Sequence, residues 1–451
     1  MIGREEIEQK VSEFAINTSN VQRDYVYGWL LAAIYSVPEA KERLILKGGN
    51  CLRKAYFEHT RYSNDLDFSA PEGVNEEVLA KWFSEASQLA QQRSGIVFEP
   101  NRMRVTPKTR VESTKEIYDV RLYFKDFYGN PDTITISVRF DITAYERIFL
   151  PVQTRTLIHP YSDADACQAI ILCVKLEEIL ASKLKCLLQR RHSADLYDYV
   201  HWLMFGVPSD ISRREILGTV LRMTIFERSP GALQGLLLEL PFTVLRNLWD
   251  RYIVAPRPSL VAFDDAVARF TQHITELFTG YAHPSHSTAF FPARFRNPIM
   301  DAASDFRLLK MRYHSVDRII EPYALVYKLR KDGEAQEYFY AWDRTGGTNS
   351  GEGIKSFIQS GIEAIEVIPE HFEPRFQVEL VKAGEPSSRS YFGSRLGRRG
   401  KFVTTFHRPY VVQCPYCGRR FRRSRNNSRL ASHKDTWGNP CYGRIGTCYM
   451  V

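Results

Sequence analysis

The residues best suited to metal and phosphate chemistry lie in one short stretch, LKGGNCLRKAYFEHTRYSNDLDFSA, residues 46–70. Asp65 and Asp67 are separated by one residue, and alternate residues of a strand point to the same face, so we expect their carboxylates side by side. Two adjacent carboxylates repel each other unless a cation lies between them. Mg²⁺, or Mn²⁺ in its place, accepts carboxylate oxygens and keeps coordination positions open for phosphates.

The first half of this stretch predicts a phosphate-binding turn. Gly48 and Gly49 follow a short apolar strand and allow the backbone to approach a triphosphate, with a helix starting just after them. Ser63 lies two residues before Asp65, where its hydroxyl can bond a phosphate oxygen. We include Lys47, immediately before the glycines, among the expected nucleotide-binding residues.

A third carboxylate, Asp141, lies in the alternating run VRFDIT of the same β-rich region. Three carboxylates from two strands can hold two metal ions, one for an attacking oxygen and one for a leaving triphosphate. A glycine pair or an Asp-x-Asp pair alone is more often structural than catalytic. Their order here, glycine turn, short helix, then Ser-x-Asp-x-Asp, favours the catalytic interpretation.

Downstream, an amphipathic helix is predicted over VKLEEILASKLKCLLQR, followed by a second over SADLYDYVHWLM. Lys183 on the first helix is suited to binding phosphates as a compact point charge. Asp198 on the second helix, fifteen residues later, could return toward the same site. The structural alternatives are a solvated lysine, and a salt bridge or first-turn acid for Asp198.

Together these three motifs resemble the DNA polymerase β-type nucleotidyltransferase superfamily and, more narrowly, the AbiEii/AbiGii toxin family of abortive-infection and type IV toxin–antitoxin systems. The resemblance covers roughly residues 1–280. It implies a polymerase β-like core, a mixed sheet with helices, whose phosphate turn is Gly48, Gly49 and Ser63. It also implies that Asp65 and Asp67 bind metal, and that Lys183 binds the phosphates of the nucleotide.

The same resemblance aligns Asp195 and Asp198 with the family's Asp-x-x-Asp, and Asp141, less directly, with a third acidic position. Family members commonly have Arg before the first of these aspartates, whereas Ala194 stands here. Which of the two aspartates is functional therefore stays open.

The C-terminal region carries a second predicted metal site. Cys414 and Cys417 form a CPYC turn, and His433 and Cys441 follow it at spacings typical of structural zinc sites. Cys448 is a rival for the fourth ligand, and His407 a weaker one. Four unrelated thiols are the alternative.

Positive charge is concentrated in the same tail. The whole chain carries +9, yet residues 389–434 contain no Asp or Glu, so the rest of the chain is net negative. We predict nucleic-acid binding here, because arginines neutralise phosphates and aromatic side chains stack on bases. The candidate arginines are Arg419, Arg420, Arg422, Arg423, Arg425 and Arg429.

The 451-residue chain is too long for one ordinary core, and we expect an α+β fold in several parts. The stretch from Arg318 to Phe376 resembles a WYL domain, a small β-barrel, although the Trp-Tyr-Leu itself is absent; a plain β-rich packing domain is the alternative. The predicted parts are a nucleotidyltransferase core at 1–150, a helical subdomain at 151–280, a linker at 281–303, the WYL-like domain at 304–388 and a zinc-binding tail at 389–451.

The leading functional hypothesis is a metal-dependent nucleotidyltransferase that transfers a nucleotide from an NTP to a nucleic-acid acceptor, for which we predict the 3′ end of tRNA. The resemblance implies a toxin or phage-defence role and a cognate antitoxin. The sequence has no apolar run of membrane-spanning length and no signal peptide at its start, so we expect a cytoplasmic protein. The alternatives are a nucleic-acid-binding regulator with a nucleotide-sensing or degenerate core, and an enzyme that modifies a protein or a small molecule.

Overall fold

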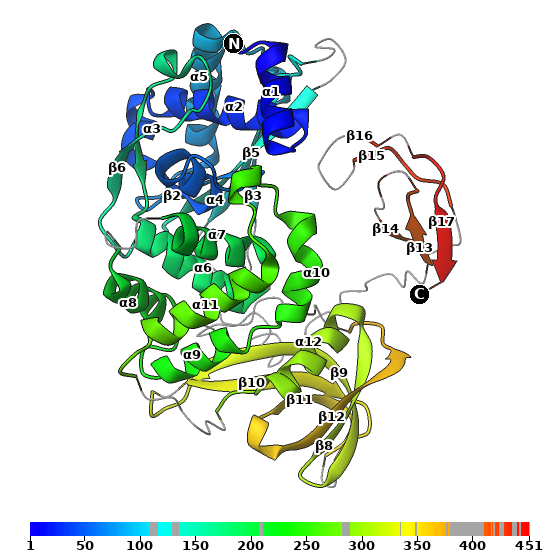
Figure 1. Cartoon of the computed structure of the whole chain (residues 1–451). Helices are drawn as coiled ribbons and strands as arrows, with labels where there is room; N and C mark the ends of the chain where they lie inside the picture. The colour runs from blue at the N-terminus through cyan, green and yellow to red at the C-terminus, as the bar shows by residue number, and fades with distance from the viewer. Residues whose placement is uncertain are drawn as a thin grey trace.

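The computed structural model of the chain describes residues 1–108, 116–128, 135–190, 192–206, 211–281, 289–333, 335–347, 350–375, 378, 410–415, 417, 420–423, 428–434, 440–441 and 443–450. These residues form a seven-stranded mixed sheet with helices, a mostly helical middle part, a five-stranded antiparallel sheet, and two small sheets near the C-terminus (Figure 1). The prediction of an α+β fold with a mixed sheet is confirmed.

The large sheet has the strand order β3-β4-β5-β2-β1-β7-β6, with β2 and β5 paired in parallel near its centre. Its strands show the alternation expected of a sheet with one buried face: in β5, Ile136, Val138, Phe140 and Ile142 are buried and the residues between them are not. The strands are β1 (Ile45–Lys47), β2 (Leu66–Ala70), β3 (Arg104–Lys108), β4 (Ile117–Lys125), β5 (Thr135–Ala144), β6 (Gln153–Thr156) and β7 (Ile170–Cys173).

The helices of the N-terminal part pack around this sheet. α2 is buried along almost its whole length and is capped by Asn17, whose side chain accepts a hydrogen bond from the amide of Asn20. α5 is capped in the same way by Asn75 and is followed by Gly95, which adopts the left-handed conformation. The helices are α1 (Arg4–Phe14), α2 (Thr18–Ile34), α3 (Pro38–Arg43), α4 (Gly48–Cys51) and α5 (Glu76–Ser94).

The sheet continues past residue 150, where the sequence predicted that the core would end. β6 and β7 lie beyond that position, and β7 pairs in parallel with β1. Both strands have only four residues, too few for a periodic signal to stand out. The two predicted helices then follow as α6 (Leu176–Arg190) and α7 (Ser193–Phe205). Four more helices complete this part of the chain: α8 (Arg213–Met223), α9 (Pro230–Leu238), α10 (Phe242–Tyr252) and α11 (Phe263–Leu277).

The predicted linker at 281–303 contains a helix, α12 (Ala293–Asp305), with Pro298 inside it. Its apolar residues, including Ile299 and Ala302, are buried, and α12 lies against the five-stranded sheet (Figure 1). The strand order of that sheet is β11-β10-β9-β8-β12. Its strands are β8 (Arg307–Tyr313), β9 (Val316–Leu329), β10 (Ala335–Asp343), β11 (Gly353–Phe357) and β12 (Ile362–His371).

The C-terminal tail forms a three-stranded sheet and a two-stranded one. Its strands are β13 (Tyr410–Gln413), β14 (Arg420–Arg423), β15 (His433–Lys434), β16 (Pro440–Cys441) and β17 (Thr447–Met450). Val412, Cys414, Leu430 and Cys441 form a small buried cluster of their own. So small an apolar cluster is a weak core, and a domain of this size usually needs a metal or a disulfide to fold.

Candidate active site

One row of paired residues crosses the large sheet and sets the geometry of the site. Lys47 on β1 is opposite Asp67 on β2, Asp67 is opposite Asp141 on β5, and Asp141 is opposite Asp119 on β4. Directly paired residues point to the same face of a sheet. The register therefore places three aspartates and a lysine side by side, although the sequence separates them by up to 94 positions.

Asp65, Asp67 and Asp141 form a carboxylate cluster, in which one oxygen from each lies within 4.8 Å of the others. Asp65 immediately precedes β2, where Asn50 Nδ2 donates to its carbonyl oxygen at 2.5 Å. Burial and the negative charge of Asp65 raise the pKa of Asp67 to about 7, while Lys47 and Lys183 act in the opposite sense. Three oxygen donors under mutual repulsion fit Mg²⁺ or Mn²⁺.

The glycine turn lies directly against this cluster. Gly48 has φ +75°, and a Cβ atom there would lie 2.1 Å from Asp67 Oδ2. A Cβ on Gly49 would lie 2.8 Å from Arg61 Nη2 and 3.1 Å from Ser63 Oγ. Ser63 Oγ in turn donates to Asp65 Oδ1 at 3.2 Å. The turn therefore has no side chains of its own and is bordered by a carboxylate, a hydroxyl and a guanidinium group.

Lys183 of α6 and the two aspartates of α7 meet in a buried ion cluster. Lys183 Nζ lies 2.7 Å from Asp198 Oδ2 and 3.2 Å from Asp195 Oδ1. The two oxygens of Asp198 also accept hydrogen bonds from Arg61 Nε at 2.6 Å and Arg61 Nη2 at 2.8 Å. Burial opposes the charges, yet Arg61 and Lys183 lower the pKa of Asp198, and the two aspartates raise the pKa of Lys183.

The structure shows how Asp195 and Asp198 are placed, the two aspartates of which the sequence left the functional one undecided. Asp198 contacts both Lys183 and Arg61, and Asp195 lies beside it with Oδ1 3.2 Å from Lys183 Nζ. Neither aspartate belongs to the group of three carboxylates that approach one another on the sheet. Their chemistry in this arrangement is to hold Lys183 and Arg61 charged and in place.

Lys47 projects along the sheet to Glu146, which follows β5, and Lys47 Nζ also lies 3.2 Å from Thr143 Oγ1. Glu146 accepts a second hydrogen bond from Ser69 Oγ at 2.5 Å. Lys47 is thus engaged by protein side chains, and it acts on Asp67 through its charge.

A second buried network fixes the helix that follows the glycine turn. Asp24 of α2 accepts from Arg53 Nε at 2.7 Å and lies 3.1 Å from Lys54 Nζ, and Tyr161 donates to its other oxygen at 2.8 Å. Arg53 and Lys54 lie in a π-helical turn, Leu52–Tyr56. Such turns are frequent at functional sites, and here the turn joins the glycine segment rigidly to α2.

The sequence interpretation missed Arg61, Asp119, Arg139 and Glu146. Arg139 bridges Asp119 and Asp141, with nitrogen–oxygen distances of 2.9 Å to each. Arg61 could have been predicted from the sequence, because it precedes Ser63, Asp65 and Asp67 at the same two-residue spacing. The other three depend on strand register, which local spacing does not reveal.

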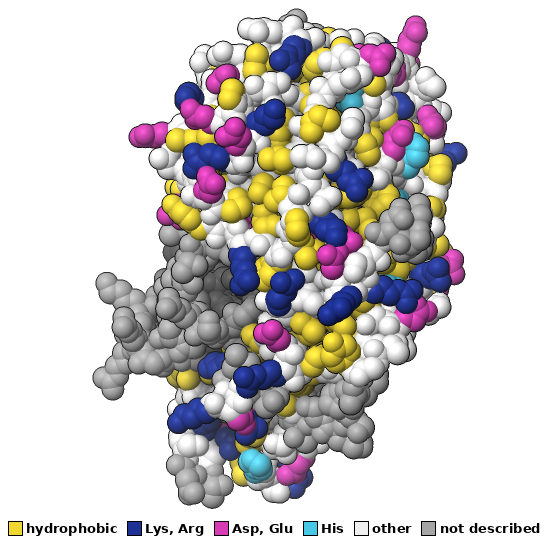
Figure 2. All heavy atoms as spheres, turned by 90° about the vertical axis from the view of Figure 1, so that its left-hand side faces the viewer, with side chains coloured by type: hydrophobic (Ala, Val, Ile, Leu, Met, Phe, Trp, Pro, Cys, Tyr) yellow, Lys and Arg dark blue, Asp and Glu magenta, His cyan; other side chains and the backbone are white. Residues whose placement is uncertain are grey.

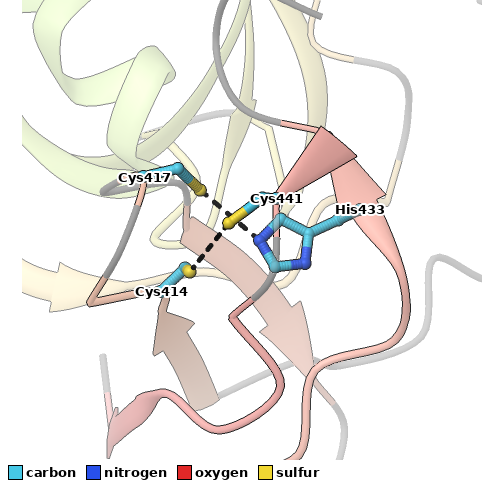
Figure 3. Close-up of side chains that lie close together, drawn as sticks. All are labelled: Cys414, Cys417, His433 and Cys441. Carbon is cyan, nitrogen blue, oxygen red and sulfur yellow. Dashed lines mark hydrogen bonds between the residues drawn. The ribbon is translucent and has the colours of Figure 1, made fainter. Parts of the chain in front are cut away.

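The four predicted zinc ligands lie together in the tail (Figure 3). Cys414 Sγ lies 3.6 Å from Cys441 Sγ, and Cys417 Sγ lies 3.4 Å from His433 Nε2. His433 Nδ1 lies 2.9 Å from the carbonyl oxygen of Ala431, and the amide of Gly443 donates to Cys441 Sγ at 3.4 Å. When His433 donates from Nδ1 to this carbonyl oxygen, Nε2 carries no proton and can bind a metal ion. Hydrogen bonds from amides to sulfur stabilise thiolates, so the four residues fit Zn²⁺.

Part of the predicted nucleic-acid surface lies beyond what the structure describes. Arg419 and Arg425, with His407, are outside the described residues, and so are the side chains of Arg420, Arg422, Arg423 and Cys448. Arg429 is described and exposed. It lies beside Ile445 in an isolated β-bridge.

The sequence profile of one protein family, described as "Nucleotidyl transferase AbiEii toxin, Type IV TA system", matches residues 29–269. The chain belongs to this family. The match spans the glycine turn, the carboxylate cluster and the Lys183 cluster, and the AbiEii-family chain is therefore a nucleotidyltransferase toxin.

Solved structures similar to this AbiEii-family chain include MenT4, a nucleotidyltransferase toxin from Mycobacterium tuberculosis H37Rv. The superposition has a TM-score of 0.40 at 19% sequence identity and covers 62% of this chain and 91% of that one. Among curated proteins, none gives a significant match. Within the described residues, none of the helices combines the length and the apolar character needed to cross a membrane.

Proposed function

We propose that this AbiEii-family enzyme transfers a nucleotide from an NTP to an RNA acceptor, the 3′ end of tRNA, with the help of a divalent metal ion. The observation that carries the proposal is the approach of Asp65, Asp67 and Asp141 within 4.8 Å of one another beside Gly48. Carboxylates at this spacing hold Mg²⁺ or Mn²⁺, which would neutralise the charge that develops on the triphosphate.

The protein's own residues bind and orient the reactants. The acceptor hydroxyl attacks the α-phosphorus, the bond from that phosphorus to the bridging oxygen breaks, and pyrophosphate leaves. Lys183 and Arg61, held charged by Asp198, bind the departing phosphates, and Ser63 donates to a phosphate oxygen. Positioning and charge neutralisation supply the catalysis, since phosphoryl-type transfer asks little covalent chemistry of the protein.

We infer that catalysis and RNA recruitment belong to different parts of the chain. The large sheet and the helices α6 and α7 form the nucleotidyltransferase unit. The WYL-like sheet and the tail, with its zinc-bound Cys414, Cys417, His433 and Cys441, recruit RNA. Support for the tail comes from its unbroken positive charge at 389–434 and from the ligand geometry of the four residues.

We place the enzyme in a toxin–antitoxin pair that acts in phage defence. The family description names a type IV system, in which a toxin works with an antitoxin partner. Modification of tRNA in the cytoplasm would arrest translation and so limit phage replication. A cognate antitoxin is the partner that this role requires.

The test is nucleotide transfer in vitro. The purified protein is incubated with each labelled NTP in turn, Mg²⁺ and total RNA, in parallel with Asp65→Asn. We expect one NTP to label a tRNA-sized band only with the wild-type protein and only in the presence of the metal. Labelling of protein instead of RNA, or an equal signal from Asp65→Asn, would overturn the proposal.

A further inference from the structure

The segment that follows β5, residues 145–150, lies next to the proposed active site and contributes Glu146 to it. Its second residue, Glu146, accepts a hydrogen bond from Ser69 and pairs with Lys47, the neighbour of Asp67 in the sheet. Its first residue, Tyr145, is 56% exposed and has φ 54°, an unusual conformation for a bulky side chain. Strain of this kind persists where the surroundings fix the backbone, and it often marks a functional position.

Two arginines stack on one aromatic ring in this segment. Arg147 Cζ lies 4.8 Å from the centroid of the Phe149 ring, and Arg222 Cζ of α8 lies 5.7 Å from the same centroid. The buried carboxylate of Glu178 accepts hydrogen bonds from the amides of Phe149 at 3.0 Å and Leu150 at 2.7 Å. The backbone at Phe149 is therefore bound to α6, and both guanidinium groups lie against the ring of this residue.

The charges of these two arginines are available to a ligand. Both side chains are exposed, and within the described part of the chain neither forms an ion pair with a carboxylate. Many other arginines near the site are paired, such as Arg61 with Asp198 and Arg139 with Asp141. Arg222 Nε donates to the carbonyl oxygen of Gly218 at 3.1 Å and Nη2 to Thr219 Oγ1 at 3.3 Å. A guanidinium group has five N–H donors, so the remaining N–H groups of Arg222 and those of Arg147 can donate to phosphates.

The surroundings extend the positive character. Arg155 on β6 is exposed and stacks on Tyr56, with Cζ 4.3 Å from the ring centroid. Figure 2 views the molecule from the side on which β6 and α8 lie, and on this face lysine and arginine side chains form a band across its middle. A band of this sign attracts a polyanion.

We propose that Tyr145, Arg147, Phe149 and Arg222 form a docking surface for the RNA acceptor strand. This inference rests on the proposed function. The exposed Tyr145 ring provides a stacking face for an unpaired base, and the two arginines bind successive phosphates. Because Glu146 links this segment to Lys47, a strand bound here leads toward the carboxylate cluster, where its terminal hydroxyl reacts.

The test is a double charge reversal, Arg147→Glu with Arg222→Glu, in the full-length protein. The control is Lys41→Glu with Arg93→Glu, two exposed cations on α3 and α5 whose reversal changes the net charge equally. RNA binding is measured by fluorescence anisotropy across salt concentrations, NTP binding by calorimetry, and RNA labelling as a function of RNA concentration. Thermal unfolding and the milder Arg147→Gln with Arg222→Gln confirm that the fold is kept.

We expect the test variant to lose about two phosphate contacts, which lowers the slope of log K against log salt by about 1.4 for single-stranded RNA. The KM for RNA should rise at least tenfold, while NTP binding stays unchanged. Tyr145→Ala should weaken RNA binding without changing the salt slope, because stacking is not ionic.

The inference is overturned if the test and control pairs bind and label RNA equally well. Failure of the proposed function gives a different result, since the wild-type protein would then label no RNA at all. A preference for DNA over RNA at equal salt would contradict the assignment of RNA to this surface.

Discussion

Lys183 and Asp198 form a buried ion pair, with 2.7 Å between Nζ and Oδ2. Lys183 comes from α6 and Asp198 from α7, and Arg61, from the segment before β2, binds the same carboxylate. The pair therefore joins α6 to α7, and Arg61 connects both helices to the segment that precedes β2. In the proposed function, Lys183 and Arg61 bind the leaving phosphates of the NTP.

Replacement of Asp198 should affect both stability and nucleotide binding. Asp198→Asn removes the charge that compensates Lys183 and Arg61, and breaking a buried pair costs about 3–5 kcal/mol. We expect a lower Tm and a higher KM for the NTP. Asp250→Asn, an exposed position on α10, is the matched control. An unchanged Tm in Asp198→Asn would show that the charge of Asp198 is not needed to hold this cluster together.

Substitutions of the neighbouring aspartates Asp141 and Asp119 should have different effects on activity. Asp141 belongs to the carboxylate cluster, whereas Asp119 is held by Arg121 at 2.9 Å and by Arg139 at 2.9 Å. Asp141→Asn should lower kcat about 100-fold or more, with a fall in Tm no larger than that of Asp119→Asn, because Arg139 binds both carboxylates. Asp119→Asn should lower Tm and keep most of the activity. Equal losses of kcat in the two variants would contradict the assignment of metal binding to Asp141.

The glycine turn offers a test with an internal control. Gly48 and Gly95 have φ +75° and +77°, so alanine strains the backbone by roughly 1 kcal/mol at either position. Only at Gly48 would the new Cβ collide with Asp67 Oδ2; at Gly95 there is open space. We expect Gly48→Ala to abolish nucleotide transfer and Gly95→Ala to lower Tm slightly with full activity. Equal activity in the two variants would show that Asp67 does not need its present position.

The raised pKa of Asp67 predicts a pH dependence of stability in metal-free protein. The folded pKa is about 7 and the ordinary value is 3.8, so between these limits the folded state binds more protons than the unfolded state. The contribution of Asp67 to the free energy of unfolding therefore falls as the pH rises toward 7. In EDTA, Tm should decline less between pH 5 and 7 in Asp67→Asn than in the wild type.

Bound Mg²⁺ should reverse this trend, because it favours the ionised carboxylates. The Tm gain on adding Mg²⁺ should grow with pH and be absent in Asp67→Asn. A Mg²⁺ effect of equal size at pH 5 and pH 8 would count against metal binding by Asp67.

The tail should contain one zinc ion per chain, measurable by elemental analysis. Cys441→Ser should lose the metal, and Cys448→Ser should keep it, because Cys441 lies with Cys414, Cys417 and His433 in the cluster of possible ligands. Chelation should unfold the tail, whose apolar cluster is small, while NTP binding to the N-terminal part persists. If Cys441→Ser kept the zinc and Cys448→Ser lost it, Cys448 rather than Cys441 would be the fourth ligand.

Much of the site could be predicted because its motifs are local. The Asp65–Asp67 pair follows from the two-residue period of a strand, and the Gly48–Gly49 turn follows from the tolerance of glycine for positive φ. The helices α6 and α7 were predicted because their apolar residues repeat at helical spacing. The short strands β6 and β7 and the proline-containing α12 were missed, because tertiary contacts rather than local pattern stabilise them.

The sequence by itself determined the residue types, the local geometry of the glycine and aspartate motifs, and the family to which the chain belongs. Only the tertiary structure decided that Asp141 and Asp119 stand in one row with Asp67, that Arg61 and Lys183 share Asp198, and that Arg147 and Arg222 flank Phe149. The physical reason is that backbone periodicity acts over a few residues. Strand register and helix packing are settled by the burial of apolar surface across the whole chain.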